Sequence, residues 1–153
     1  MRTFIATAAL LGLTALGAAF PTTAAQASED TVADTGCDSK WGSRDGNMYG
    51  WDHLDCNDPL LIAASGDNPD WGAVRNRVAS VMNRGFVGGR DHVKFYDYTY
   101  YRGGHACLAP GELYADDLNN DWFTGDPNGD VVVVDNIESH KWVTRSECGT
   151  LLT

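Results

Sequence analysis

Short runs of β-forming residues alternate with clusters of Gly, Asn, Asp and Pro along most of the chain, and no long amphipathic helical pattern follows residue 27. In the clearest run, residues 92–98, apolar and polar side chains alternate as in a strand with one buried face. Further short strands are predicted at 105–109, 113–118 and 131–134, and segment 118–129 is expected to form a loop or one helical turn. The pattern therefore predicts an all-β protein.

Two short segments resemble each other, one near the end of each half of the chain. Aligning residues 74–81 with 133–140 pairs Asn76 with Asp135, Val78 with Ile137 and Ser80 with Ser139. A Greek key leaves one apolar face unburied, so two such motifs packed face to face form a shared core. We therefore expect a β-sandwich with a first Greek key in residues 37–86 and a second in residues 87–153.

The N-terminal segment, residues 1–27, has the features of an export signal. Arg2 precedes an apolar stretch, and Ala25-Gln26-Ala27 has the small residues that a signal peptidase cleaves after. The stretch is shorter than the roughly 20 residues of a membrane span, although a retained anchor is the alternative. Residues 28–36 are polar and lack periodicity, which indicates a disordered tail, and residues 37–153 suffice for one domain. We expect a secreted monomer without membrane contact once the signal is cleaved.

All four cysteines lie beyond the export signal, where thiols oxidise. Two disulfides are therefore expected. Among the three possible pairings we favour Cys37 with Cys56 and Cys107 with Cys148, because each bridge then stays within one half of the chain. Zinc is the alternative use of four cysteines, but no Cys-x-x-Cys occurs and the histidines have no ligand spacing.

The chain is strongly acidic. Its formal charge is −10 and includes Arg2, so the exported part carries a charge of −11. Nucleic acid and anionic lipid are poor partners for such a protein. Most of the acids are aspartates in turns such as 67–70, where they favour turn formation and solubility. Calcium binding is the functional alternative, because turn aspartates are common calcium ligands.

An aromatic motif follows the clearest predicted strand. Four residues separate Tyr96 from Tyr101, and Gly103 follows after one more, which matches the signature of the βγ-crystallins. The segments around Ser80 and Ser139 resemble the closing serine-containing strand of the same motif. The resemblance implies two Greek keys of the βγ-crystallin kind.

The first half departs from this signature. With Tyr49 as the first aromatic residue, Leu54 and Cys56 stand where the second aromatic residue and the glycine belong. The export signal, the cysteines in both halves and segment 76–83 make the chain similar to the small secreted bacterial proteins of the crystallin-fold peptidase inhibitor family. The resemblance covers residues 47–143 and implies a disulfide-stabilised inhibitor of an extracellular protease, with metalloproteinases as the characterised targets.

Inhibition would use a surface loop that the sheets and disulfides hold in one conformation, so that little entropy is lost on docking. The candidate contact residues come from two loops, 119–129 and 98–102, and are Trp122, Phe123, Tyr98, Tyr100 and Arg102. At least one of the pair Trp122 and Phe123 is expected to cap the core instead.

In calcium-binding crystallins the closing segment provides a carbonyl and a hydroxyl to the ion. In the register of the internal repeat, ligand positions are taken by non-ligands such as Ala79 and Val134, so both sites look degraded. Shifting the second half by one residue places Asp135, Asn136 and Ser139 at the ligand positions and restores one site. Structural closure of the sheet is the preferred interpretation and calcium the alternative. No other cofactor is expected.

Catalysis is disfavoured. The adjacent carboxylates of Asp116 and Asp117 would point to opposite faces of a strand. No glycine-flanked nucleophile turn surrounds Ser80 or Ser139. We therefore expect a peptidase inhibitor rather than an enzyme. A calcium-binding or stress-protective crystallin and a cell-wall, glycan or toxin-like binding module are the alternatives.

Overall fold

The structure, a computed structural model, describes residues 36–127 and 129–153. The predicted export signal and all but the last residue of the predicted tail lie outside these residues. Within the described part, no helix has the length and apolar character needed to cross a membrane. In chain order the elements are α1 (Cys37–Trp41), β1 (Met48–Trp51), β2 (Leu60–Ala64), η1 (Gly72–Val74), β3 (Ser80–Asn83), β4 (His92–Tyr98), β5 (Arg102–Leu108), β6 (Tyr114–Ala115), η2 (Leu118–Asn120), β7 (Trp122–Phe123), β8 (Val131–Val132), β9 (Ser139–Val143) and η3 (Arg145–Glu147).

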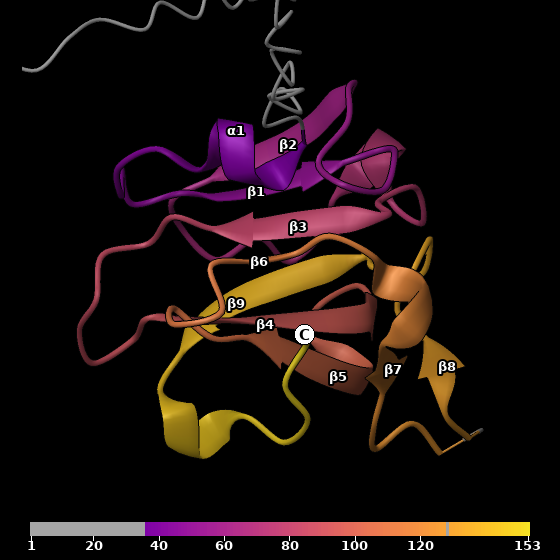
Figure 1. The fold of residues 1–153 in the computed structure, drawn as a ribbon. Helices are drawn as coiled ribbons and strands as arrows, with labels where there is room; N and C mark the ends of the chain where they lie inside the picture. Colours follow the sequence, from indigo (N-terminus) through magenta and orange to yellow (C-terminus); the bar gives the residue numbers. More distant parts are fainter. Residues whose placement is uncertain (1–35, 128) are drawn as a thin grey trace, which may run out of the picture. The chain divides into compact units, whose positions relative to one another are not determined.

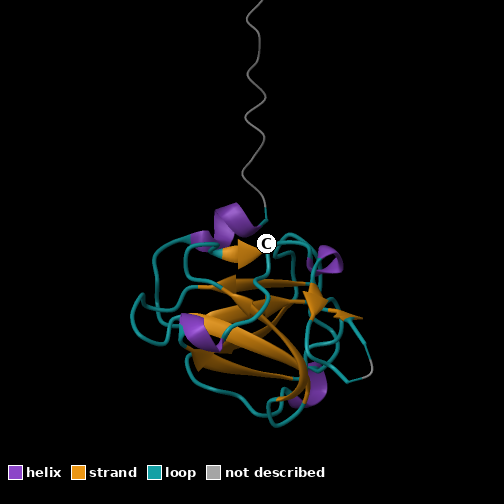
Figure 2. Cartoon of the chain, turned by 90° about the horizontal axis from the view of Figure 1, so that it is seen from below, coloured by secondary structure: helices purple, strands orange, loops and turns teal. Residues whose placement is uncertain are grey.

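The strands form antiparallel sheets (Figure 1). One sheet has the strand order β2-β1-β3-β6 and a second has the order β5-β4-β9, while β7 and β8 form a separate pair. The short helical segments lie around the periphery of the strands (Figure 2). The predicted all-β class is confirmed.

Agreement with the predicted strands is closest at β4, whose bounds coincide with the alternating run 92–98. Its side chains alternate as expected, with Val93 and Phe95 fully buried. The strand predicted at 105–109 is β5, which begins earlier, at Arg102, and ends at Leu108. The strands predicted at 113–118 and 131–134 are shorter than expected: β6 covers Tyr114–Ala115, and β8 ends at Val132 while Val133 is buried in the core. Segment 118–129 contains both the predicted helical turn, η2, and the unpredicted strand β7.

In each half of the chain, the third strand of the Greek key pairs with the sheet of the other half. In the first half, β1 lies between β2 and β3, which are the second and fourth strands of a Greek key. The third position, Asn68, pairs instead with His140 of β9 through two main-chain hydrogen bonds of 3.0 Å. The second half repeats the arrangement, because β4 lies between β5 and β9 while β6 pairs with β3. The predicted pair of Greek keys is therefore present, and the two keys are interlocked.

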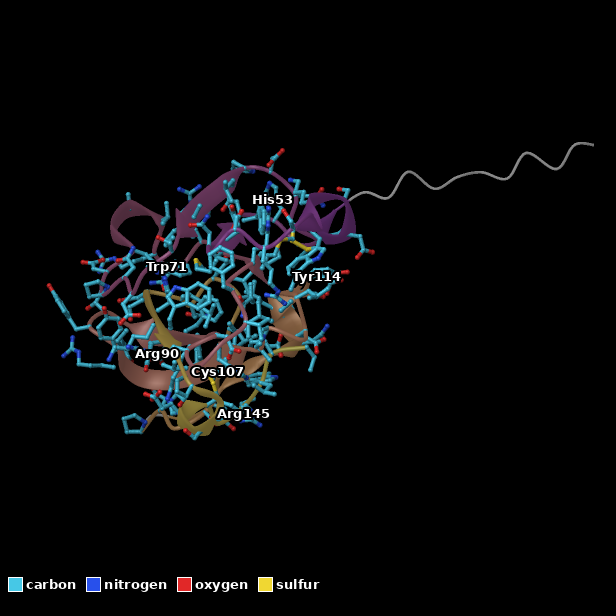
Figure 3. All side chains as sticks on the ribbon, turned by 90° about the vertical axis from the view of Figure 1, so that its left-hand side faces the viewer. His53, Trp71, Arg90, Cys107, Tyr114 and Arg145 are labelled. Atoms are coloured by element: carbon cyan, nitrogen blue, oxygen red, sulfur yellow. A yellow bond between two sulfur atoms is a disulfide. The ribbon has the colours of Figure 1, made fainter. Side chains whose placement is uncertain are left out.

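The main core lies between the two sheets and includes side chains from both. Trp71 packs edge-on against Phe95 of β4, with ring centroids 6.1 Å apart, and is seen between the two sheet ribbons in Figure 3. Its indole Nε1 donates a hydrogen bond of 2.8 Å to His140 Nδ1. Met48 and Val81 contribute from the first sheet. Burial of these side chains is the main favourable term in folding.

Both predicted disulfides are present, Cys37–Cys56 and Cys107–Cys148. The first attaches α1 to the outer face of the first sheet, where Trp51 and Met82 join the two sulfurs in a small second cluster. The second attaches the segment after β9 to β5, and Leu151 then pairs in parallel with Cys107. Each bridge joins residues of one half only, so no covalent link other than the chain itself connects the two halves within the described residues.

The turn after the first strand has the same backbone conformation in both halves. Asp55 and Cys56 have φ angles of 57° and 51°, and Tyr100 and Tyr101 have φ angles of 58° and 61°. Cys56 therefore corresponds to Tyr101, which makes Trp51, not Tyr49, the first aromatic residue of the signature in the first half. The register that placed Cys56 at the glycine position is wrong. A buried cysteine takes the place of the second aromatic ring because this half uses the position for its disulfide.

The internal repeat is confirmed by reciprocal hydrogen bonds. The Asn76 N–H donates to Ile137 O, and the Asp135 N–H donates to Val78 O, each at 3.0 Å. Asn76 and Asp135 also share a left-handed conformation, with φ angles of 56° and 55°. Asparagine and aspartate tolerate this region better than most residues, which explains why they occupy these positions.

The two serines of the repeat close the two turns in the same way. Ser80 Oγ accepts a hydrogen bond from the Cys56 N–H (2.9 Å) and donates to His53 O (2.7 Å). Ser139 Oγ accepts from the Tyr101 N–H (3.2 Å) and donates to Tyr98 O (2.7 Å). Both serines are fully buried. The predicted role of this segment in closing the sheet is therefore filled by the side-chain hydroxyls.

Replacing either Ser80 or Ser139 by alanine is expected to lower the free energy of unfolding by about 1–3 kcal/mol, because a turn N–H loses its acceptor. Denaturant unfolding followed by tryptophan fluorescence measures the change. Ser146→Ala, at an exposed position, is the matched control and should change the value by less than about 0.5 kcal/mol. Equal stability of all three variants would contradict the proposed role of the two hydroxyls.

Candidate functional site

The turn at 98–102 is exposed and rigid. Tyr100 is 65% exposed, and Tyr98 and Arg102 are also on the surface. The Tyr100 N–H donates to Pro69 O at 2.7 Å, and Arg102 Nε donates to Thr99 O at 3.2 Å. With Tyr100 and its successor in the left-handed region, the backbone is a tight turn. Its backbone is therefore not extended at Tyr100 and Tyr101.

The pair Trp122 and Phe123 is divided between surface and core. Phe123 is fully buried and belongs to the main cluster, so it is not accessible to a partner. Trp122 is 51% exposed. The expectation that one member of the pair caps the core therefore applies to Phe123, and Trp122 is the exposed contact candidate of this segment.

The most exposed large apolar side chains lie in a loop that the sequence patterns did not single out. Phe86 is 67% exposed and Val87 is 69% exposed, and both belong to the connection between β3 and β4. This loop extends from the sheets at the left of Figure 1. The available signal was the composition of 85–89, two apolar residues between glycines. The sequence patterns predicted no role for these two apolar residues.

Hydrogen bonds fix both ends of this loop, which we call the 85–90 loop. At its start, Gly85 O accepts from Arg44 Nη1 (2.7 Å) and the Gly85 N–H donates to Asn83 Oδ1 (3.0 Å). At its end, the Gly88 N–H donates to Asp91 Oδ2 (3.0 Å). Gly85 is buried against the indole of Trp142. A Cβ atom at this position would lie only 2.4 Å from the ring, so a side chain would not fit without a shift. The exposed tip is therefore held between two anchored ends.

Arg90, labelled in Figure 3, closes the loop against β9 by donating from Nε (2.9 Å) and Nη2 (2.6 Å) to Trp142 O. The Trp142 N–H donates to Asp67 Oδ1 at 2.8 Å. These contacts border a cavity of about 460 Å³ that is lined by Gly46, Ser65, Gly66, Asp67, Gly85, Phe86, Arg90 and Trp142. The loop therefore stands beside a recess with apolar, cationic and anionic walls.

Two of the three predicted calcium ligands, Ser139 and Asn136, have structural partners. Ser139 Oγ is buried and bonded to the backbone, and Asn136 Nδ2 donates to Val134 O at 2.8 Å. Burial and the charge of Asp52 raise the pKa of Asp135. Among residues 36–127 and 129–153, no group of three or more His, Cys, Asp or Glu side chains is arranged to hold a metal ion.

Glu138 occupies the hydroxyl position of the crystallin-type site in the second half, and hydrogen-bond donors surround it. Its Oε1 accepts from Asn76 Nδ2 (3.0 Å), and its Oε2 accepts from the Thr99 N–H (3.1 Å). Arg75 Nη1 lies 3.9 Å from Oε2, and Arg75 Nε lies 3.4 Å from Asp70 Oδ1. The positive charge beside Glu138 comes from this guanidinium.

The residues once considered for catalysis are bonded elsewhere. Both serine hydroxyls of the repeat bind main-chain atoms, as described above, and neither bonds to a histidine ring. His140 is fully buried, with Nδ1 accepting from Trp71 and Nε2 donating to Gly66 O at 2.9 Å. Burial lowers the pKa of His140 to about 4, so the ring is neutral. His140 therefore has a structural position in the core.

Comparisons with known proteins found no matching family model and no matching curated protein. Among solved structures, the chain is similar to one from "Evolution of the eye lens beta-gamma-crystallin domain fold" (18% identity, TM-score 0.47, covering 65% of this chain and 86% of that chain). It is also similar to a βγ-crystallin from Ciona intestinalis (13%, 0.46, 63% and 99%) and to one from an archaeon (15%, 0.39, 63% and 96%). The interlocked strand order, rather than these similarities, defines the fold as a disulfide-stabilised pair of Greek keys.

Proposed function

We propose that the protein is an exported inhibitor of an extracellular peptidase, possessing the 85–90 loop as its principal contact surface. Export is supported by the two disulfides, which use all four cysteines and persist in oxidising compartments. The resemblance of the aromatic signature and the cysteine pattern to the crystallin-fold peptidase inhibitors gives the class of partner.

The exposure of Phe86 and Val87 on an anchored loop is the observation that carries the proposal. Apolar side chains exposed by two thirds are unfavourable in water and gain the most from entering a partner's pocket. Because Arg44, Asn83 and Asp91 already fix the loop ends, docking costs little further ordering of the backbone. Anchored apolar residues of this kind supply most of the binding energy at compact interfaces.

The shape of the loop suits the active-site cleft of a peptidase. A Cβ atom added at Gly88 or Gly89 would meet no other atom within 4 Å, so the loop is narrow beyond its apolar tip. A narrow loop can enter a cleft that excludes a broad surface. Phe86 and Val87 would then occupy neighbouring apolar subsites, with the recess beside the loop facing the rim of the cleft.

Phe86→Ala and Val87→Ala are each expected to weaken inhibition about 30-fold or more, the effect of losing an anchor residue. Inhibition constants against a panel of thermolysin-like and serine peptidases measure the change. Tyr100→Ala and Trp122→Ala are matched controls, because they remove exposed aromatic rings from the two loops that the sequence predicted. Loss of inhibition in a control alone would assign the contact to that control's loop.

The unmodified domain provides the more basic test. If it slows no peptidase of the panel at micromolar concentration, the proposed function is excluded. Melting curves of each variant confirm that any loss of inhibition is not a loss of folding, since Phe86 and Val87 lie outside both apolar clusters.

A further inference from the structure

β2 is an open edge strand of the first sheet. It stands at the end of the strand order β2-β1-β3-β6, near the top of Figure 1. Among the described residues, neither a strand nor an isolated bridge pairs with its outer side. The strand, Leu60–Ala64, contains no charged residue and no proline, although proteins commonly use such residues to protect an open edge. An edge of this composition can accept a further strand.

The corresponding edge in the second half of the chain is covered. β5, the second strand of the second Greek key, pairs on its outer side with Thr124 and, at Cys107, with the C-terminal segment. His105 and Thr124 exchange main-chain hydrogen bonds of 2.9 and 3.1 Å, and Cys107 bonds to Thr150 and Leu152. β2 has no such cover within residues 36–127 and 129–153. The first half therefore leaves open an edge that the second half protects.

The register of β1 shows which main-chain groups of β2 face outward. The Arg84 N–H donates to Asn47 O at 2.9 Å, so the odd-numbered residues of β1 bond to β3 and the even-numbered residues face β2. Gly50 pairs with Ile62, so the N–H and C=O of Ile62 face β1. Those of the next residue, the exposed Ala63, therefore face away from the sheet.

Each end of β2 carries one acidic and one basic side chain. At the start of the strand, Asp58 forms an ion pair of 3.0 Å with Lys40. Beyond its end, Asp67 lies 3.8 Å from the guanidinium of Arg90. Two antiparallel copies of β2 would place the start of one strand beside the end of the other, so that the acid at each end meets a base of the second copy. The open edge is therefore complementary to itself in charge as well as in hydrogen bonding.

We propose that a second copy of the chain pairs with β2, through a two-fold antiparallel contact that joins the first sheets of the two copies. The Ala63 N–H of each copy donates to a main-chain carbonyl in β2 of the other. An edge contact of this kind is small, so half of the chains are paired only at a concentration on the order of 100 μM. The monomer expected from the sequence is then the dilute form. The proposal concerns β2 and holds whether or not the protein inhibits a peptidase.

Sedimentation velocity between about 10 and 500 μM is expected to show the mass of the unmodified domain rising from one chain towards two. Ala63→Pro removes the outward N–H and should weaken pairing about tenfold or more, because two intermolecular hydrogen bonds are lost from each pair. Ala63→Ser is the matched control: it keeps the N–H and should pair as the unmodified domain does. Melting curves show whether the proline variant is folded.

Amide hydrogen exchange of the unmodified domain gives a second readout that needs no variant. Exchange of the Ala63 N–H should slow as the concentration rises, whereas the Ile62 N–H, which faces β1, should exchange at an unchanged rate. The proposal is overturned if the domain stays monomeric at the highest concentration, or if folded Ala63→Pro pairs as well as Ala63→Ser. It is equally overturned if the chains pair without slowing exchange at Ala63, since another surface then makes the contact.

Discussion

Replacing Cys107 and Cys148 together by serine is expected to lower the free energy of unfolding by about 4 kcal/mol, because the disulfide no longer restricts the unfolded chain. The bridge closes a segment with a sequence separation of 41, against 19 for Cys37–Cys56. The unfolded chain gains more freedom when a longer loop is released. Replacing Cys37 and Cys56 by serine should therefore lower the free energy of unfolding by less, about 3 kcal/mol. Guanidinium unfolding of the two double variants measures both values.

The ranking of the two variants is the informative result. Loss of the Cys107–Cys148 bridge also frees the C-terminal segment, whose Leu152 N–H donates to Cys107 O at 2.8 Å. Loss of the other bridge frees only the five-residue helix α1. If the Cys37–Cys56 variant proved the less stable of the two, the second core cluster would be contributing more than its small size indicates.

Acidification is expected to destabilise the protein through His140, by about 3 kcal/mol between pH 7 and pH 4. Burial lowers the pKa of this histidine to about 4 in the folded state, whereas its ordinary value is 6.5. The unfolded chain therefore binds a proton in this interval that the folded chain does not. The stabilisation is fully present above pH 6.5 and is lost as the pH falls towards 4.

The measurement is the difference in unfolding free energy between the unmodified domain and His140→Gln at pH 7, 5.5 and 4. A difference is needed because burial raises the pKa of Asp97 to about 7 and that of Asp121 to about 6, so these acids favour the folded state as the pH falls. Glutamine removes the titration, and the constant loss of packing against Trp71 cancels between pH values. A difference that is independent of pH would show that the ring titrates normally.

The sequence patterns predicted what depends on local periodicity and oxidation chemistry. β4 was located to the residue because its side chains alternate, and the serine repeat was found because both halves need a hydroxyl to close the same turn. The disulfide pairing followed from keeping each bridge within one half. Each of these features can be inferred from a short segment or from the positions of the cysteines along the chain.

What the sequence did not reveal depends on contacts between distant segments. Tyr49 and Trp51 are two residues apart, and only the turn conformation at Cys56 shows which of them begins the motif. The exposure of Phe86 cannot be inferred from composition, because apolar residues between glycines are also found packed beneath loops. Asp97 lies within the predicted strand 92–98, and the sequence does not show that the folded backbone brings Asp126 beside it.

If the proposed function is correct and a peptidase cleaves the 85–90 loop, the pairing of each third strand with the other sheet decides whether the two pieces stay together. A break between Phe86 and Val87 would divide the molecule into two fragments that no disulfide joins. The bridge from Asn68 to β9 and the pairing of β6 with β3 would still hold the two fragments together. The severed ends, each tethered by its own hydrogen bonds at Gly85 and Gly88, would stay in register in the enzyme, where religation competes with release.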